Sequence, residues 1–239
     1  MKIIKTVSDV VSNFLLVFVV LVVGVFAFSF NGVKTIQTAN SEYNGTIYAG
    51  DKSSKNVSLM VNVCWGTEYV EEMLKILDKH KVKITFFVGG DWAKDNAELL
   101  KRIHGSGHEI ANHGTSHKEH GKISYDENLS EIQRCHQIVK DILKIDMELF
   151  APPGGSYSKL TTKASETLGY KTIMWTRDTI DWRDKDANLI FDRATMKMSG
   201  GDLVLMHPTV CTVDAFERII LHIKNKGLNV TTVSQTLGL

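Results

Sequence analysis

Apolar runs typical of strands alternate with apolar positions at helical spacing through most of this chain. Ser58–Cys64 (SLMVNVC) and Lys83–Val88 (KITFFV) are short, mainly apolar runs of the kind found in buried strands. Between them, Val70, Met73 and Leu77 recur at the spacing of one helix face. Strands that alternate with helices build βαβ units, so the sequence predicts an α/β fold with a mainly parallel sheet or barrel.

The alternation continues toward the C-terminus. Asn96–Ile103 has helical spacing, and Glu109–Ala111 is a short extended piece. Ser124 and Glu127 form a capping box that opens a long helix. Three more elements are expected: strands at Lys171–Trp175 and Leu203–Met206, and a helix at Ala215–Lys224. In parallel α/β folds the chemistry lies in loops at the carboxyl ends of strands, so residues that directly follow strands are the first candidates.

The N-terminal region contains an uncharged run of seventeen residues, Phe14–Phe30, whose one polar residue is Ser29. This is the lower length limit of a membrane-spanning helix, about 17 to 25 residues, and is longer than the apolar part of a typical cleaved signal. Lys2 and Lys5 precede the run, which favours a cytoplasmic N-terminus over residues 1–13. We therefore expect a transmembrane anchor or signal segment over 14–30, and a single-pass cell-membrane protein whose domain lies outside the cytoplasm. Cleavage would make the protein secreted, and a buried core helix is the remaining alternative.

Two segments follow this run. Residues 31–56 are rich in Asn, Ser, Thr, Gly and Lys and are predicted to be a linker, with a short strand near Thr46–Ala49. The globular domain is expected over residues 57–239. The chain has 28 Lys and Arg against 27 Asp and Glu, a net charge of +1, which argues against a nucleic-acid partner because such binders carry a basic excess. Three cysteines in 239 residues do not make a disulfide framework.

Three polar features follow expected strands. His113 and His117 are four residues apart, a spacing that lets two imidazoles share a zinc or similar ion, although nine histidines make a chance pair plausible. Asp181 and Trp182 place a carboxylate beside an aromatic ring, which suits a sugar site, while a surface Asp with a packing Trp is the plainer interpretation. His207 stands at the exit of an apolar run, where a single histidine is more often structural than catalytic. The three together favour a functional site.

The order of these motifs resembles that of the polysaccharide deacetylase family, whose domain is called the NodB-homology domain, over essentially residues 57–239. Five stretches carry the resemblance: TFFVGGDW (85–92), GHEIANHGTSH (107–117), FAPPGGSY (150–157), DTIDW (178–182) and LMHPT (205–209). WGTE at Trp65–Glu68 is similar to the first motif of the membrane-anchored sporulation and cell-wall branch of that family.

The resemblance implies a distorted (β/α) barrel of the NodB-homology type with a groove at the strand ends. It also implies a hydrolase that removes acetyl groups from N-acetylated sugars of a cell-wall polysaccharide, such as peptidoglycan or a chitin-like glycan. His113 and His117 match the metal-binding histidines, and the expected divalent metal is zinc, with cobalt, nickel or manganese as alternatives. His207 matches the general acid, and Asp181 matches the carboxylate that orients it. Residues that match the walls of the groove are Trp182, Pro152, Pro153 and Gly154.

The chain departs from the family pattern at the base. Asn62 stands where the family has the Asp that acts as general base, and an amide does not accept a proton near neutral pH. Val63 stands where the third metal ligand is expected, and Cys64 is the neighbouring candidate for that ligand. Ala151 replaces the Arg that braces the missing base, so base and brace are lost together. Substitutes for the base are Glu68, Asp178 and His207, and Asn62 could also contribute its carbonyl oxygen to the metal.

Two functions therefore compete at the level of the sequence. The first is a metal-dependent deacetylase that works through another base, with His207, Asp181 and Asn62 as the catalytic set and His113, His117 and Cys64 as metal ligands. The second is a catalytically silent domain that still binds an envelope glycan. The expected partners are the cell-wall polysaccharide and, through the N-terminal segment, the membrane, with no nucleic acid. A purely structural wall or spore protein is a third class.

Overall fold

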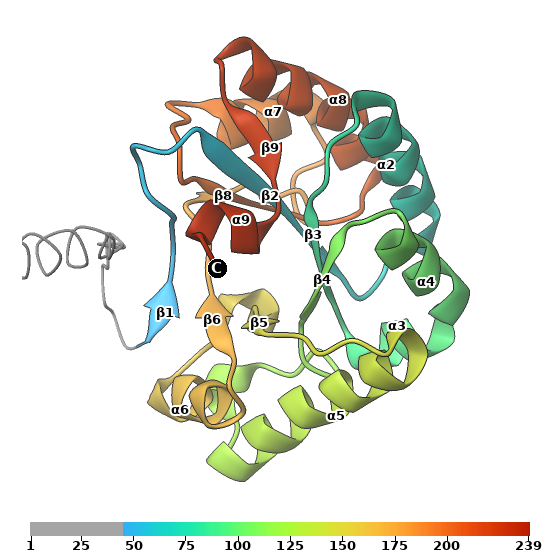
Figure 1. Ribbon diagram of the computed structural model, residues 1–239, viewed down its shortest axis with the longest axis vertical. Coiled ribbons are helices and arrows are strands. Elements are labelled where there is room, and N and C mark those ends of the chain that lie inside the picture. The colour runs from blue at the N-terminus through green and yellow to red at the C-terminus, as the bar shows by residue number, and fades with distance from the viewer. Residues whose placement is uncertain (1–44) are drawn as a thin grey trace, which may run out of the picture. The chain divides into compact units, whose positions relative to one another are not determined.

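The computed structural model describes residues 45–239, which form a curled, parallel sheet surrounded by helices (Figure 1). The strand order is β1-β6-β5-β4-β3-β2-β8-β7, with β9 beside the start of β2, and every pairing is parallel. The strands are β1 (Thr46–Ile47), β2 (Asn56–Val63), β3 (Thr85–Val88), β4 (Glu109–Asn112), β5 (Leu149–Phe150), β6 (Lys171–Ile173), β7 (Arg177–Asp178), β8 (Leu203–Met206) and β9 (Asn229–Thr231). Within this part of the chain the sheet stays open between β1 and β7, which makes it a half-barrel rather than a closed one.

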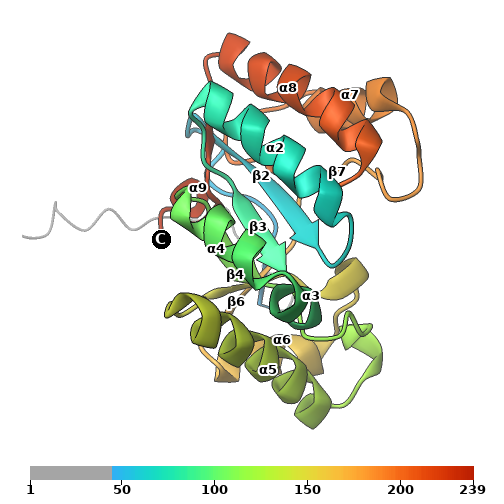
Figure 2. The same cartoon turned by 90° about the vertical axis from the view of Figure 1, so that its right-hand side faces the viewer.

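The helices other than α9 lie on the outside of the sheet, with α2 and α8 side by side and α5 against α6 (Figure 2). The helices are α2 (Thr67–His80), α3 (Gly90–Asp95), α4 (Ala97–Gly105), α5 (Tyr125–Leu143), α6 (Lys159–Thr167), α7 (Ala187–Thr195), α8 (Val210–Asn225) and α9 (Val233–Leu237), with short 3₁₀ turns η1 (His120–Lys122) and η2 (Pro153–Gly155). The predicted α/β barrel of the NodB type is thus confirmed as a curled parallel half-barrel. The alternation of strand and helix patterns predicted the parallel α/β arrangement, and the resemblance to the polysaccharide deacetylase family implied the NodB-type barrel.

Alternate residues of the strands face two separate cores. Val57, Leu59 and Val61 of β2 pack in the larger core between the sheet and the outer helices. Met60, from the same strand, packs in a smaller core inside the half-barrel, together with Phe87 and Leu203. The period of two therefore divides each strand between helix packing and the barrel interior. Each fully buried Val or Leu contributes roughly 1.5 to 3 kcal/mol.

The last helix, α9, closes the barrel at the starts of the strands. Val233 and Leu237 of α9 belong to the interior core, and the Val233 N–H donates to Oγ1 of Thr85 at 2.8 Å. The Ser58 hydroxyl donates to the carbonyl oxygen of Thr232 at 2.8 Å. The interior is thereby plugged at one end, so the carboxyl ends of the strands form the end that is available for a site.

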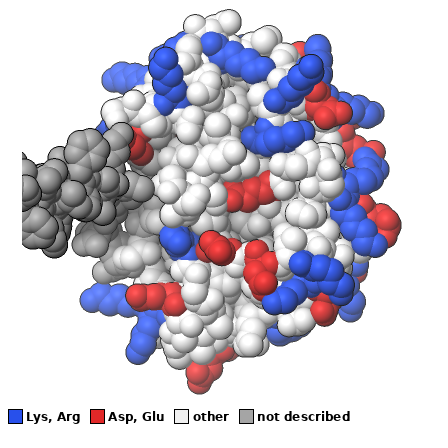
Figure 3. Space-filling view, viewed as in Figure 1, with Lys and Arg blue, Asp and Glu red and all other residues white. Residues whose placement is uncertain are grey.

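The face over α9 and β9 carries charges of both signs. Figure 3 shows Lys and Arg side chains interspersed with Asp and Glu over this face, which matches the formal net charge of +1. On the face drawn there, no extended field of one sign develops.

Several observed elements were not predicted from the sequence: the helices α3, α6, α7 and α9 and the two-residue strands β5 and β7. The helix α3 begins at Gly90, with Gly89 as its N-cap, and no helical pattern in the sequence indicated it. A Cβ atom at Gly90 would lie 3.1 Å from Cα of Cys135 and 3.2 Å from Cα of Thr115, so a glycine lets three chain segments approach closely here. The expected short strand near Thr46–Ala49 is β1, which covers Thr46–Ile47 and pairs with β6.

The predicted location of the protein in the cell membrane is contradicted by the described structure. None of the helices in residues 45–239 is both long and apolar enough to cross a membrane. The longest of them, α5, has 19 residues but carries charged side chains such as Glu127, Glu131 and Lys140. Charges of this kind are costly in hydrocarbon, which is the physical reason for the correction. The uncharged run at 14–30, on which the prediction rested, lies outside the described residues, as do the predicted N-terminal segment 1–13 and most of the predicted linker 31–56.

Candidate active site

The end of β2 places polar side chains into the half-barrel. Val63 is fully buried in the outer core, on the side of the helices, and so cannot replace a metal ligand. Asn62, one residue earlier, faces the interior and lines a cavity at the carboxyl ends of the strands. Cys64 is two residues beyond Asn62, and strand periodicity returns its side chain to the same side. The structure therefore directs Val63 away from the interior and leaves Asn62 and Cys64 as the candidates for the third ligand.

Cys64, His113 and His117 form a cluster with metal-ligand chemistry. One ligand atom from each residue lies within 4.8 Å of the others. Nδ1 of His113 lies 2.7 Å from the carbonyl oxygen of Ala151, so its N–H donates there and Nε2 is left with a lone pair. A Cβ at Gly89 would lie 2.6 Å from Sγ of Cys64, so a glycine makes room for the thiol.

The protonation states in this cluster suit cation binding. Burial, together with the nearby His117, lowers the pKa of His113 to about 3, so its imidazole is neutral at pH 7. Burial also lowers the pKa of His117. Burial raises the pKa of the Cys64 thiol to about 12, so a thiolate here needs a bound cation to stabilise it. Two neutral imidazoles and one thiol are a donor set that fits zinc or a similar soft divalent metal.

Asp181 and His207 form a hydrogen-bonded pair at the same cavity, which His207 lines. Nδ1 of His207 lies 2.8 Å from one carboxylate oxygen of Asp181. The other oxygen accepts the backbone N–H of His207 and the hydroxyl of Thr212, both at 2.6 Å. Asp181 is 3% exposed, so this buried carboxylate is satisfied by three donors. The pair fixes the imidazole ring and leaves its Nε2 for the cavity.

Backbone strain accompanies this arrangement. Ile180 has a φ of 53°, which is uncommon for a β-branched residue, and its N–H donates to a side-chain oxygen of Asp178 at 2.8 Å. His117 also has a positive φ, 54°. Such conformations cluster at functional sites because the surrounding structure holds them in place.

Three tryptophans border the cavity, whose volume is about 440 Å³. The ring of Trp65 stacks on His207, with centroids 5.8 Å apart and planes at 6°. Trp182 is 58% exposed, so much of its ring surface is open to a ligand. The cavity is lined by Asn62, Trp65, His117, Gly154, Trp175, Asp178, Trp182, Leu205 and His207. Flat apolar rings beside a few polar groups are typical of a pocket for a small polar ligand such as a sugar.

Not all of the predicted groove residues reach this cavity. Gly154 lines it, whereas Pro152 and Pro153 are buried at and beside η2. Pro153 instead lies beside the histidine loop: a Cβ atom added at Gly114 would lie 3.6 Å from Cγ of Pro153. Of the proposed substitute bases, Asp178 lines the cavity, and Glu68 is exposed in the first turn of α2.

Asn62 differs from every other polar group of the cavity because its carbonyl oxygen, Oδ1, is buried and has no hydrogen-bond partner in the described structure. Ala151, which replaces the expected Arg, is fully buried in the interior core and offers no side-chain donor. An unpaired buried carbonyl costs about 1 to 3 kcal/mol. The base side of the cavity is therefore neutral and incompletely hydrogen-bonded.

Three residues that contribute to the site were not predicted from the sequence: Trp175, Thr212 and Glu131. Glu131 of α5 is 2% exposed, and its carboxylate accepts the backbone N–H groups of Thr115 and Ser116 in the histidine loop. The signal was present, because Asn128, Glu131 and Cys135 lie at helical spacing on the buried face of α5. Polar residues within an otherwise apolar face indicate a specific partner.

Comparison with known proteins identifies the family. A family model described as polysaccharide deacetylase matches residues 49–173, which is more than half of the chain. The chain therefore belongs to the polysaccharide deacetylase family. The narrower assignment to the sporulation branch of this family stays a prediction. Its membrane anchoring is the part that the described helices contradict.

Individual relatives include proteins with different activities. The chain is 36% identical to the uncharacterized protein YlxY of Bacillus subtilis over 80% of this chain, and it spans 60% of the length of that relative. It is 28% identical to the peptidoglycan-N-acetylmuramic acid deacetylase PdaA of Bacillus subtilis, over 85% of this chain and 79% of that protein. It also superposes, with a TM-score of 0.79 and 36% identity, on the crystal structure of a CE4 family pseudoenzyme from Bacillus anthracis, over 81% of this chain and 69% of the other.

Proposed function

We propose that this domain binds an N-acetylated cell-wall glycan in the cavity lined by Asn62, Trp182 and His207. It does so without removing the acetyl groups at the rate of an ordinary deacetylase. The observation that carries this proposal is Asn62 at the position of the general base. Amide hydrolysis needs a group that takes a proton from the attacking water, which contributes roughly 10²- to 10⁴-fold to the rate. A neutral amide does not supply that step.

The remaining residues keep the features that a glycan ligand requires. Trp65 and Trp182 offer exposed ring faces on which a sugar can stack. His113, His117 and Cys64 would hold a divalent metal, which when bound supplies Lewis acidity toward the acetamide carbonyl and toward water. The chain's own residues orient the acetamide between this cluster and His207. The similarity to a CE4 family pseudoenzyme supports binding without turnover, and the similarity to peptidoglycan deacetylases supports the class of ligand.

A second function, slow deacetylation, is favoured by the intact pair of Asp181 and His207. Asp181 holds Nδ1 of His207 at 2.8 Å, which leaves Nε2 to protonate a leaving amine. In this alternative His207 would also have to act first as the base. The imidazole would take the proton of the attacking water and then return it to the leaving amine.

Glycan binding and acetate release, measured on the same protein, distinguish these functions. We expect chitin oligomers to bind with a heat signal in calorimetry, and Trp182→Ala to weaken the binding by roughly tenfold, since stacking on an aromatic ring is lost. Leu160→Ala is the matched control, because Leu160 is 47% exposed on α6 and does not line the cavity. Acetate release from chitin oligomers or peptidoglycan that falls with His207→Ala would support the second function instead. A domain that neither binds nor hydrolyses these glycans would refute both.

A further inference from the structure

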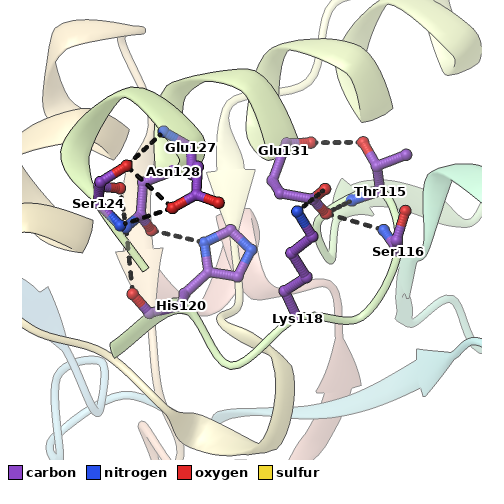
Figure 4. A network of polar contacts seen from close by, with 8 residues as sticks. All are labelled: Thr115, Ser116, Lys118, His120, Ser124, Glu127, Asn128 and Glu131. Carbon is purple, nitrogen blue, oxygen red and sulfur yellow. Dashed lines mark hydrogen bonds and ion pairs between the residues drawn. The ribbon is translucent and has the colours of Figure 1, made fainter. Parts of the chain in front are cut away.

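Glu131 is a buried carboxylate that holds the loop between the two candidate metal-binding histidines. One oxygen, Oε2, accepts the N–H of Thr115 at 3.0 Å and that of Ser116 at 2.8 Å. The backbone carbonyl of Glu131 accepts the Thr115 hydroxyl at 2.7 Å. Nζ of Lys118 lies 3.7 Å from the other carboxylate oxygen, Oε1 (Figure 4). The side chain of Glu131 is 3% exposed, so its carboxylate depends on these protein contacts and not on hydration by bulk water.

The opposite side of the same loop is held by α3. The Gly90 N–H donates to the carbonyl of Gly114 at 2.9 Å, and the Asp91 N–H donates to that of Thr115 at 3.1 Å. Thr115 therefore has its N–H, its carbonyl and its hydroxyl all bound by groups from α3 or α5. The close approach at Gly90, described above, keeps these two helices and the loop in contact. The loop is clamped from both sides.

The clamp acts on a backbone that is not relaxed. Gly114 has a φ of 71° and His117 a φ of 54°, so the loop changes direction at both of its ends. A non-glycine residue in this conformation costs free energy and persists only where the surrounding structure holds it. The hydrogen bonds from Thr115 and Ser116 to Glu131 hold the two residues that directly precede His117.

From these contacts we infer that Glu131 is a positioning residue for the metal-binding loop: its carboxylate fixes the backbone at Thr115 and Ser116 and thereby sets the separation of the His113 and His117 imidazoles. The inference rests on the proposed metal site. Residues behind the ligands typically change metal affinity by about 10- to 100-fold when they are removed. Glu131 does so through the backbone of the loop, without touching either imidazole.

Two substitutions at this position separate hydrogen bonding from charge. Glu131→Ala removes the acceptor for both N–H groups, and we expect zinc affinity to fall by about 10- to 100-fold in a competition titration. Glu131→Gln keeps one carbonyl oxygen, and since both N–H groups donate to a single oxygen, this variant should stay within a few-fold of the native affinity. Recovery of affinity in Glu131→Gln is the result that a role of charge alone would not give.

A matched control excludes a general loss of stability. Val139→Ala creates a cavity on the same helix, with Val139 fully buried in the outer core, and should lower thermal stability while leaving zinc affinity unchanged. Should Glu131→Ala fail to fold, Glu131→Asp, which is one methylene too short to reach the loop, is the second variant with the same expectation. Native zinc affinity in a folded Glu131→Ala or Glu131→Asp protein would overturn the inference.

Amide hydrogen exchange gives a readout that does not depend on metal. We expect the Thr115 and Ser116 amides to exchange slowly in the native protein and at least tenfold faster in Glu131→Ala. If the native protein binds no zinc, the proposed metal site fails, and exchange alone then decides whether Glu131 clamps the loop. Equal exchange rates in the two proteins would overturn the clamp, whatever the outcome for zinc.

Discussion

The two walls of the cavity differ in how completely their polar groups are paired. On the wall of Asp181 and His207, one buried carboxylate accepts three hydrogen bonds from a histidine and a threonine. On the wall of Asn62 and Ala151, a buried carbonyl has no partner and the neighbouring side chain is a methyl group. The first wall retains what an acid catalyst needs, and the second has lost what a base needs. Losing the charge and its brace together leaves a neutral wall, whereas losing one of them would leave an unpaired buried charge.

The largest effect is expected from the candidate metal ligands Cys64, His113 and His117. In His113→Ala/His117→Ala we expect no zinc binding, and hence no stabilisation by zinc; in the native protein, zinc at 100 times its dissociation constant should add about 2.7 kcal/mol to the free energy of unfolding. The cobalt form of the native protein should show the absorption of a thiolate bound to cobalt, and Cys64→Ser should remove it.

The control for this measurement is His104→Ala, because His104 lies on α4 outside the cluster. It should bind zinc like the native protein. A double histidine variant that still binds one equivalent of zinc would place the metal elsewhere. A native cobalt spectrum in Cys64→Ser would remove Cys64 from the ligand set.

Restoring the base wall should produce the next largest effect. Asn62→Asp supplies a carboxylate, and Ala151→Arg supplies the missing donor to hold it, so the double variant should release acetate at least 10²-fold faster than the native protein. The gain should exceed the product of the two single gains, because the groups act as a unit.

His207→Ala, added to the same double variant, should remove most of the gained activity. This would show that the new base works with the acid on the opposite wall. Additive single effects, or a gain that persists without His207, would mean that the two walls are not coupled in the way proposed here.

The fold and the wall of Asp181 and His207 were predictable, because short runs of neighbouring residues indicate them. The mainly apolar runs Ser58–Cys64 and Leu203–Met206 predicted two of the strands, and the position of His207 directly after the second run predicted its place at the strand ends. The helical spacing of Glu131 with Asn128 and Cys135 indicates that Glu131 is buried, but its partners were not predictable, because they are backbone N–H groups sixteen and fifteen residues away. Backbone donors leave no mark on the sequence, whereas side-chain motifs do.

The smallest effect is expected for Asn62→Leu, which tests the wall of Asn62 and Ala151 through the stability of the fold alone. Leu has the same number and branching of side-chain heavy atoms as Asn and removes the unpaired carbonyl, so the free energy of unfolding in urea should stay the same or rise by up to about 1 kcal/mol. The matched control is Asn112→Leu at the end of β4, where the buried amide donates to the Ile132 carbonyl at 2.9 Å and accepts the Gly114 N–H at 2.9 Å. That change leaves paired groups without partners and should lower the free energy of unfolding by about 2 to 3 kcal/mol. A loss of 1 kcal/mol or more in Asn62→Leu would show that a bound water or ion satisfies the Asn62 carbonyl in solution. The two walls would then differ in which acid or base groups they carry, and not in how completely their polar groups are hydrogen-bonded.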